Sequence, residues 1–470
     1  MTRVNNVIFN NKMYILMKEG KRQAHLSGNN VLVSSVSEIE KMDLPAFFSY
    51  DEHKYKGNRF LWSEPGRALS FVGLGSVLTL TANNATTRYE EINKTWMAIA
   101  AEAIIDHNIS EYVGPILFGG FSFDPNIART EKWGDFAHTS FAVPQFMVTE
   151  YEGKTWLTMN AWISSDEGEI EQEQWSIDVA KYAYEVSDRD VLQSIMKEEI
   201  APSDWMSAVG EAASSIRNGE LEKVVLARAI TLEAKEPFHA EEVVRSLLTD
   251  QLDTYVFAID KQCSCFIGAT PERLIKRQGD QFQTLSLAGS IARGATASED
   301  EHLGSFLSQD VKNLHEHELA VHMIKDAMLE LCEDVEAPNA PIIRKLKDIQ
   351  HLATPITGQA KPNVTLLQAV EALHPTPALG GMPRQAALEA IRTLEHMDRG
   401  WYAAPIGWLN MRLEGEFAAA IRSALLKDRS AYLFAGCGIV GDSDPLSEYN
   451  ETALKFRPML AALQAAEIEE

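Results

Sequence analysis

Consecutive strand-like segments joined by short connections constrain the fold of this chain more than any other feature. They occur between residues 223 and 289 and again between 401 and 440, where runs rich in Val, Ile, Leu, Phe and Ala are separated by few residues. Strands that follow one another at such short intervals pair antiparallel, because a parallel pair needs a crossover of a dozen or more residues. The helical stretches between these runs are then expected to cover the sheet faces. The sequence therefore predicts an α+β fold rather than a repeating βαβ pattern.

The chain divides into two parts of different character. Residues 1–200 contain short strand-like runs broken by Gly, Asn and Pro, with one helical stretch near 90–107. We expect this part to add strands to the same fold as the rest of the chain. A helix is expected at 189–200, before a proline-containing break and a second helix capped by Ser203. Residues 201–465 carry the longer strands and are expected to form the catalytic region.

The composition argues against several classes of partner. The 470 residues are 45% hydrophobic and 23% charged, as in ordinary globular proteins, and the formal net charge is −24. This charge argues against nucleic acid and anionic membranes as partners, since both require basic surfaces. No apolar run approaches the roughly 18 residues of a membrane span, and the N-terminus lacks a signal-peptide pattern. With four cysteines and no CxxC pair, we expect reduced thiols and a cytoplasmic location.

A strand, a glycine-bearing turn and a helix start follow one another near the C-terminus. Gly436 and Gly438 allow backbone N–H groups to come close to an anion, because no side chain stands in the way. Asp444 can cap the following helix, and Pro445 suits its first position. One face of that helix then carries two carboxylates and an ammonium group, from Glu448, Glu451 and Lys455. A metal that bridges carboxylates to an anionic ligand needs this combination, although a solvated helix with a Glu451–Lys455 pair would show the same pattern.

Other polar residues stand where a core would prefer apolar ones. Glu316 lies in a helical stretch with apolar residues on much of its circumference, and a buried carboxylate needs a cation or a metal as its partner. Periodicity nominates Glu318 as readily as Glu316, and the pattern does not choose between them. Taken alone, Lys223 has an ordinary explanation as a solubilising strand end, and Glu272 has one as part of a helix start after Thr270-Pro271. No nucleotide-binding loop or zinc-protease helix fits the sequence.

A set of short segments in the C-terminal two thirds forms an ordered pattern. These segments are Lys223–Arg228, Gly268–Glu272, Leu287–Ser290, His315–Glu318, His351–Thr354, His374–Gly381, Arg399–Tyr402, Arg422 and Ala435–Lys455. In this order they resemble the chorismate-utilising enzymes, a family of isochorismate synthases, salicylate synthases and the large chains of anthranilate and aminodeoxychorismate synthases. The resemblance covers about residues 200–460 and is loose before them. It implies two packed antiparallel β-sheets flanked by helices, the fold of anthranilate synthase component I.

Within this family, the residue at the Lys223 position distinguishes members that use water as the nucleophile from members that use ammonia. Members that add water resemble this chain in having lysine there, whereas members that add ammonia lack it and need a glutamine amidotransferase partner. The resemblance implies that Lys223 deprotonates water for attack at ring carbon 2 of chorismate, a role for which a lysine pKa must be lowered. Glu272 would protonate the departing 4-hydroxyl, a role for which a carboxyl pKa must be raised. No amidotransferase subunit is expected.

The resemblance also implies a Mg2+ site and an anion-binding pocket. Glu316 and Glu451 would bind the ion directly, and Glu448 would lie just behind them. Asn313 stands where relatives often carry an acidic residue, and this slightly reduces the charge around the ion. For His351, a hydrogen-bonded core histidine is the alternative to a pocket role. The residues that match the substrate pocket are Gly289, Ser290, His351, Ala378, Tyr402, Arg422, Gly436, Gly438 and Lys455.

The expected reaction is the reversible, Mg2+-dependent conversion of chorismate to isochorismate. Salicylate synthases go on to eliminate pyruvate, and they resemble one another in having Thr where this chain has Ala378. Ala378 therefore favours isochorismate as the final product. The long N-terminal part resembles members of the menaquinone pathway more than the shorter members of siderophore pathways. The alternatives are a salicylate synthase, which pyruvate release would reveal, and an isochorismate synthase of siderophore biosynthesis.

Overall fold

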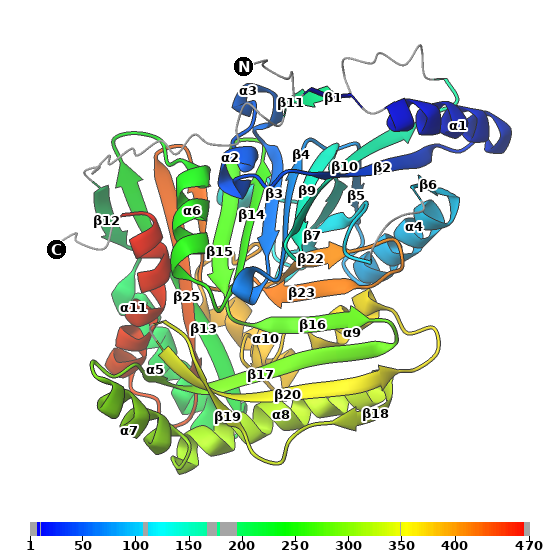
Figure 1. Ribbon diagram of the computed structural model, residues 1–470. Coiled ribbons are helices and arrows are strands. Elements are labelled where there is room, and N and C mark those ends of the chain that lie inside the picture. Colours follow the sequence, from blue (N-terminus) through cyan, green and yellow to red (C-terminus); the bar gives the residue numbers. More distant parts are fainter. Residues whose placement is uncertain are drawn as a thin grey trace.

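Two β-sheets form the centre of the computed structural model, which describes residues 7–9, 11–106, 111–166, 176–178, 195–347 and 349–464. Neighbouring strands of the first sheet pair antiparallel, except that β2 and β6 are parallel. In spatial order its strands are β12 (Ile195–Glu199), β13 (Lys223–Ala234), β25 (Ser430–Ile439), β24 (Ser423–Lys427), β15 (Ser264–Thr270), β14 (Tyr255–Lys261), β3 (Asn58–Ser63), β4 (Leu69–Leu74), β9 (Phe146–Tyr151), β10 (Lys154–Ile163), β2 (Val31–Ile39) and β6 (Ile104–Ile105), with β21 (Gly381–Met382) also paired to β13. Most of its strands lie in the upper half of Figure 1, while β13 and β25 extend into the lower half.

All neighbouring strands of the second sheet pair antiparallel. In spatial order they are β18 (Cys332–Glu336), β20 (Ile349–Ala360), β17 (Gln281–Ala292), β16 (Arg273–Gln278), β23 (Gly415–Ala419), β22 (Pro405–Leu409), β7 (Leu117–Phe121), β8 (Thr139–Val143) and β5 (Leu78–Thr81), with β19 (Ile342–Lys345) also paired to β20. In Figure 1 the strands β16, β17, β18 and β20 of the second sheet lie in the lower half, whereas its strands β5 and β7 lie beside β9 and β10 of the first sheet. A separate pair joins β1 (Val7–Phe9) to β11 (Ser176–Asp178). Strands from before and after residue 200 share both large sheets, and the division at residue 200 stays a prediction.

Helices flank the sheets and close their apolar faces. Those that pack on the first sheet include α6 and α11, and those that pack on the second include α8 and α9. The helices are α1 (Asn11–Ser27), α2 (Leu44–Phe48), α3 (Glu52–Tyr55), α4 (Arg88–Glu102), α5 (Pro202–Arg217), α6 (Ala240–Asp250), α7 (Ala297–Leu307), α8 (Val311–Leu331), α9 (Leu366–Leu373), α10 (Arg384–Leu394) and α11 (Pro445–Ala462).

Aromatic side chains fill the space between the two sheets. Phe60 of β3 stacks on Phe118 of β7 with ring centroids 4.3 Å apart. Phe71 of β4 meets the edge of Trp408 of β22 at 5.2 Å. All four side chains are buried, and such pairs add to the large apolar area that each ring removes from water. The predicted α+β fold with two packed antiparallel sheets and flanking helices is confirmed.

The pairing of β13 with β25 sets the geometry of the functional region. The first ten residues of β13 are buried, because neighbouring elements cover both of its faces. Its register with β25 runs from Val224 opposite Ile439 to Glu233 opposite Ser430. Consequently Gly438 lies opposite Val225, next to the point where Lys223 begins the strand.

Two local predictions are wrong. Residues 195–199 form strand β12 instead of the end of a helix, because they pair with Ile230–Ala234 of β13, and this pairing overrides the helix preference of Met, Lys and Glu. The remainder of the predicted helix, 189–194, lies outside the described residues. The next helix begins at Pro202 after Ala201, without a side-chain cap from Ser203.

The Thr270–Glu272 segment does not start a helix either. Thr270 ends β15 in the first sheet, and Arg273 begins β16 in the second. The Glu272 N–H donates to Thr270 Oγ1 at 3.2 Å, which resembles a cap bond but here closes a turn between sheets. Glu272 is therefore placed where the chain crosses from one sheet to the other.

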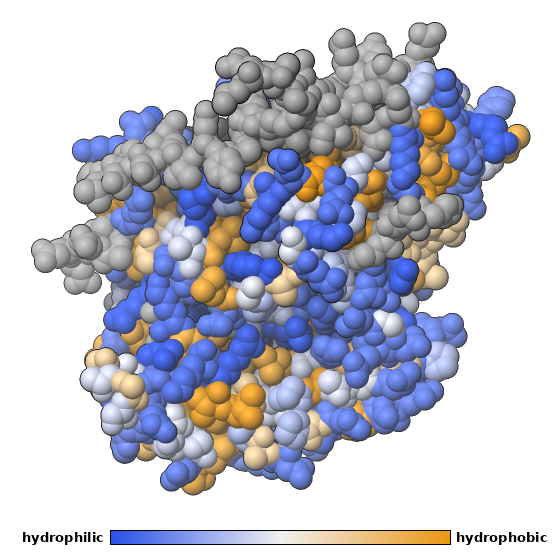
Figure 2. All heavy atoms as spheres, in the orientation of Figure 1, coloured by the Kyte–Doolittle hydropathy of each residue, from blue (hydrophilic) through white to orange (hydrophobic). Residues whose placement is uncertain are grey.

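The face of the molecule seen in Figure 2 is mostly hydrophilic, with hydrophobic residues in smaller groups between the charged ones. This agrees with a chain whose formal net charge is −24. Among the helices that the structure describes, none combines the length and apolar character needed to cross a membrane.

Candidate active site

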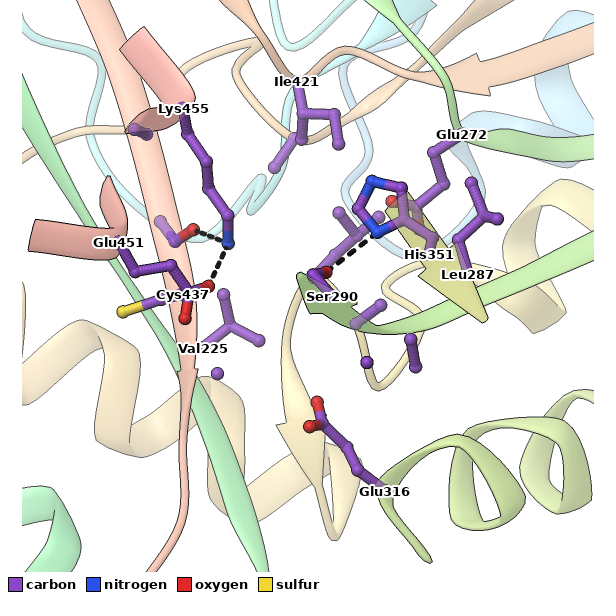
Figure 3. Close-up of a pocket in the computed structure, with 18 of the residues that line it drawn as sticks. Val225, Glu272, Leu287, Ser290, Glu316, His351, Ile421, Cys437, Glu451 and Lys455 are labelled. Atoms are coloured by element: carbon purple, nitrogen blue, oxygen red, sulfur yellow. Dashed lines mark hydrogen bonds and ion pairs between the residues drawn. The ribbon is translucent and has the colours of Figure 1, made fainter. Parts of the chain in front are cut away.

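One cavity of about 320 Å³ brings together every residue that the sequence predicted for the site. Its walls come from β13 and β25 of the first sheet, β17 and β20 of the second, and helices α8 and α11 (Figure 3). The predicted residues that line it are Lys223, Glu272, Gly289, Ser290, Glu316, His351, Ala378, Tyr402, Arg422, Gly436, Gly438, Glu448, Glu451 and Lys455. The fold thus assembles them from distant parts of the sequence, and their individual roles stay predictions.

The start of α11 points its charged face into this cavity, as the sequence indicated. Asp444 caps the helix by accepting from the Ser447 N–H at 2.9 Å, and Pro445 occupies the first turn. Lys455 Nζ lies 2.7 Å from Glu451 Oε1 and donates to the Gly436 carbonyl oxygen at 2.9 Å (Figure 3). The Lys455 charge lowers the pKa of Glu451. The ammonium group is thereby fixed beside β25 at the wall of the cavity.

Lys223 and Glu316 meet across the cavity from β13 and α8. Lys223 Nζ lies 2.5 Å from Glu316 Oε1, and the lysine is 8% exposed. A β-carbon at Gly438 would lie 2.6 Å from Lys223 Cε, so a side chain there would push the lysine away. Glu318, which the sequence could not distinguish from Glu316, is exposed on another side of α8. The direction of the helix therefore selects Glu316 for the cavity.

Glu272 is a buried carboxyl on the opposite side of Figure 3 from Glu451 and Lys455. Burial raises its pKa to about 7, although the Thr376 hydroxyl and the charges of Lys223, Lys455 and Arg422 lower it in part. Thr376 Oγ1 donates to Glu272 Oε1 at 3.4 Å. A carboxyl in this environment keeps its proton near neutral pH, as a general acid requires.

His351 lies in the cavity wall as a neutral ring. Its Nδ1 is 2.8 Å from Ser290 Oγ, while Nε2 has no hydrogen-bond partner. Burial, and then the charges of Arg422 and Lys455, lower its pKa to about 3. Gly289 has a φ of 73° at an irregularity of β17, where a β-carbon would approach Asn313 Oδ1 to 3.1 Å. His351 is thus both hydrogen-bonded within the protein and exposed to the cavity.

Tyr402, Ala378 and Arg422 complete the wall beyond Glu272. Tyr402 stacks on Phe434 of β25 with ring centroids 5.3 Å apart. Arg422 precedes β24 with a φ of 50°, and its carbonyl accepts from the Ala269 N–H at 3.0 Å. Arg422, Lys223 and Lys455 bring three cationic groups to this cavity, which suit an anionic ligand; two of them, Lys223 and Lys455, are paired with Glu316 and Glu451.

Several lining residues had no role in the sequence-based prediction. Arg399 belongs to a segment that matches the family, but the match said nothing of what its side chain does. Lys312 also lines the cavity, one helical turn before Glu316, and its Nζ lies 3.5 Å from Asp442 Oδ1. The i, i+4 spacing to Glu316 is the signal that could have indicated Lys312. The apolar lining residues Ala403 and Ile421 lie outside the matching segments and show no distinguishing pattern in the sequence.

The three predicted metal-binding carboxylates supply the all-oxygen donors that Mg2+ prefers. Burial, and to a smaller extent the Glu451 charge, raise the pKa of Glu448, and a bound cation would relieve this repulsion. The donor set therefore fits the ion. Within the described part of the chain, no three His, Cys, Asp or Glu side chains are close enough to hold a metal as they stand, and two of the predicted ligands, Glu316 and Glu451, are paired with lysines instead.

Comparison with known proteins agrees with this geometry. A model of the family described as "Chorismate binding enzyme" matches residues 19–464. The chain belongs to this family.

Two curated relatives match along most of their length. Isochorismate synthase MenF of Bacillus subtilis (strain 168) is 43% identical over 445 residues, which are 92% of this chain and 93% of that protein. The salicylate biosynthesis isochorismate synthase of Pseudomonas aeruginosa is 37% identical over 460 residues, 94% of this chain and 92% of that protein. Both relatives therefore share the N-terminal part as well as the region that carries the cavity.

A solved structure shows the same fold. The menaquinone-specific isochorismate synthase MenF of Escherichia coli superposes with a TM-score of 0.75 and 23% identity, covering 96% of this chain and 99% of that one. At this identity the likeness concerns the fold alone. It confirms the two-sheet architecture that the resemblance implied.

Proposed function

We propose that this chain is an isochorismate synthase, which adds water at ring carbon 2 of chorismate and removes the 4-hydroxyl. The observation that carries this proposal is the presence of Lys223 and a proton-retaining Glu272 in the same cavity. The B. subtilis relative, which is named an isochorismate synthase, supports the same reaction because it is 43% identical over 92% of this chain.

Lys223 and Glu272 each carry out one proton transfer of the reaction. Lys223, as the neutral amine, accepts a proton from the water whose oxygen bonds to ring carbon 2. Glu272, with a pKa of about 7, gives its proton to the oxygen that leaves ring carbon 4. The two ring double bonds shift between these positions. Water is added and water is lost, so the overall reaction is an isomerisation.

The remaining polar residues hold the substrate. Arg422 and Tyr402 face the enolpyruvyl carboxylate, and Lys455 with the Gly436–Gly438 segment completes the anion cradle. Neutral His351 can donate or accept a hydrogen bond but adds no charge. Glu316 and Glu451, with Glu448 behind them, would hold Mg2+, and the bound ion would offset the charge of the ring carboxylate of chorismate.

The name of the B. subtilis relative leads us to assign the enzyme to menaquinone biosynthesis. The B. subtilis relative carries the name MenF, and Ala378 favours stopping at isochorismate. Water as the nucleophile makes an amidotransferase subunit unnecessary. The four cysteines are all free, which agrees with the reducing environment of the cytoplasm.

Incubation of the purified protein with chorismate and Mg2+, with and without EDTA, tests this function. Chromatography would separate isochorismate, salicylate and pyruvate. Metal-dependent isochorismate without pyruvate is the expected result, in the absence of glutamine and ammonia. Stoichiometric salicylate and pyruvate would instead assign a salicylate synthase.

A further inference from the structure

The outer edge of β13 is closed by two side chains where a neighbouring strand is missing. β12 pairs with β13 at Ile230–Ala234, and β21 pairs with it at Lys223 and Val224. Between these points no described strand pairs with that edge. Instead, the Ala227 N–H donates to Glu395 Oε1 at 2.7 Å, and Arg399 Nη2 donates to the Val225 carbonyl oxygen at 2.8 Å. The pair thus satisfies backbone groups that an edge strand would otherwise leave unpaired.

Glu395 and Arg399 form a buried ion pair. Their side chains are 2% and 3% exposed, and they join through Arg399 Nε to Glu395 Oε2 at 2.8 Å and through a second bond between Nη2 and Oε1. Burial by itself lowers the pKa of Arg399, but the Glu395 charge raises it overall. A buried ion pair usually stabilises a fold no better than apolar residues of similar size. Apolar residues would leave the Ala227 N–H and the Val225 carbonyl oxygen unpaired, so this pair holds the edge of β13 in place beside the cavity.

Arg399 also contacts two further segments of the cavity wall, one through its guanidinium group and one through its backbone carbonyl. Arg399 Nη1 donates to the Leu379 carbonyl oxygen at 2.9 Å, next to Ala378. The Arg399 carbonyl accepts from the Tyr402 N–H at 2.8 Å. Arg399 therefore connects the strand that begins with Lys223 to the segments that carry Ala378 and Tyr402. Arg399 lines the catalytic cavity while Glu395 lines a second cavity, so the pair also forms the partition between them.

We propose that Arg399, held by Glu395, is a positioning residue that fixes the strand beginning with Lys223 against the neighbouring segment that carries Ala378. This inference rests on the proposed function, because Lys223 is the base in that reaction. In the anion cradle, Lys455 is held by Glu451 and by the Gly436 carbonyl oxygen. Loss of the pair should therefore misplace the base without removing the residues that bind the substrate.

The substitution Arg399→Lys tests this role, because lysine keeps the positive charge beside Glu395 but cannot bond to two carbonyls and both carboxylate oxygens at once. We expect kcat to fall by about tenfold to a hundredfold, the usual effect of a small misplacement of reacting groups. The KM for chorismate should stay within about threefold of the unmodified value. Glu395→Gln, which keeps an acceptor for the Ala227 N–H but loses the charge, should show the same separation of kcat from KM.

The pair of Arg59 and Asp260 provides a matched control. It is also buried in the first sheet, with Arg59 Nε 2.6 Å from Asp260 Oδ2 and exposures of 2% and 4%, but neither residue lines the catalytic cavity. Arg59→Lys should lower Tm as Arg399→Lys does, while its kcat stays within about twofold of the unmodified protein.

The kcat and KM values of these variants decide whether Arg399 positions Lys223. A kcat loss confined to the Arg399 and Glu395 variants supports the positioning role. Unchanged kcat in folded Arg399→Lys, an equal kcat loss in Arg59→Lys, or a rise in KM alone would overturn it while leaving the proposed function in place. If the unmodified protein does not convert chorismate, the proposed function fails first, and the positioning role fails with it.

Discussion

Replacing Glu272 by Gln should make the protein more stable at alkaline pH while abolishing its activity. Burial raises the Glu272 pKa from 4.5 to about 7, so the folded state holds this proton more tightly than the unfolded state does. The stability that this proton provides is fully present below pH 4.5 and is lost as pH rises through 7. A pKa raised by this amount corresponds to about 3 kcal/mol of unfolding free energy. Glutamine does not titrate and avoids this loss.

Chemical denaturation of both proteins at pH 4 and pH 8 measures the effect. We expect the unfolding free energy of Glu272→Gln, relative to the unmodified protein, to increase by about 3 kcal/mol between these values. The comparison between the two proteins is necessary because Glu64, whose pKa burial raises to about 8, titrates in the same range. Its contribution is common to both and cancels.

The same pair of proteins tests the catalytic argument. In the unmodified enzyme, kcat/KM should fall as pH rises through about 7, since Glu272 must be protonated to act as the acid. A stability difference that is the same at both pH values would show that folding does not raise the pKa of this carboxyl. Substantial activity of Glu272→Gln would show that another group protonates the leaving oxygen.

Further substitutions and conditions test other parts of the cavity. Lys223→Ala should lower kcat by about 10² to 10⁴, the range of general base catalysis, while calorimetry still detects chorismate binding; loss of binding would place Lys223 in the anion cradle instead. Gly438→Ala should reduce kcat by about tenfold or more, because its β-carbon would lie 2.6 Å from Lys223 Cε, and a normal rate would contradict that crowding. Ala378→Thr should increase pyruvate release, with a change in barrier of about 1 to 3 kcal/mol, and an unchanged product ratio would remove Ala378 as the determinant. Glu451→Gln should weaken Mg2+ binding in calorimetry, whereas unchanged affinity would exclude Glu451 as a ligand.

The sequence predicted those elements whose signals are local. The Asp444-Pro445 start of α11 depends on a cap and a proline in adjacent positions, and both act in the structure as expected. The strands around Lys223 and Gly436 follow from continuous apolar runs, which are buried in β13 and β25. The membership of the family follows from short segments in a fixed order, and the comparisons confirm it.

The sequence could not predict features that depend on distant partners. Residues 195–199 prefer a helix locally, and only the edge of β13 makes them a strand. Glu316 and Glu318 are equivalent by periodicity until the contact with Lys223, 93 residues away in sequence, selects one of them. Arg399 acts through the backbone of Val225 and Leu379, and no side-chain pattern records a bond to a carbonyl oxygen.

The charges of the cavity explain how an acidic protein can receive an anionic substrate. Each lysine that the proposed reaction uses is bound to a carboxylate that we assign to the metal: Lys223 to Glu316 and Lys455 to Glu451. Without a cation these pairs neutralise one another, so neither group is left buried and uncompensated. The same carboxylates cannot bind both a lysine and Mg2+ at full strength. A cation that binds Glu316 and Glu451 would therefore release Lys223 to act as the base and Lys455 to bind the substrate. We expect chorismate to bind weakly when Mg2+ is withheld.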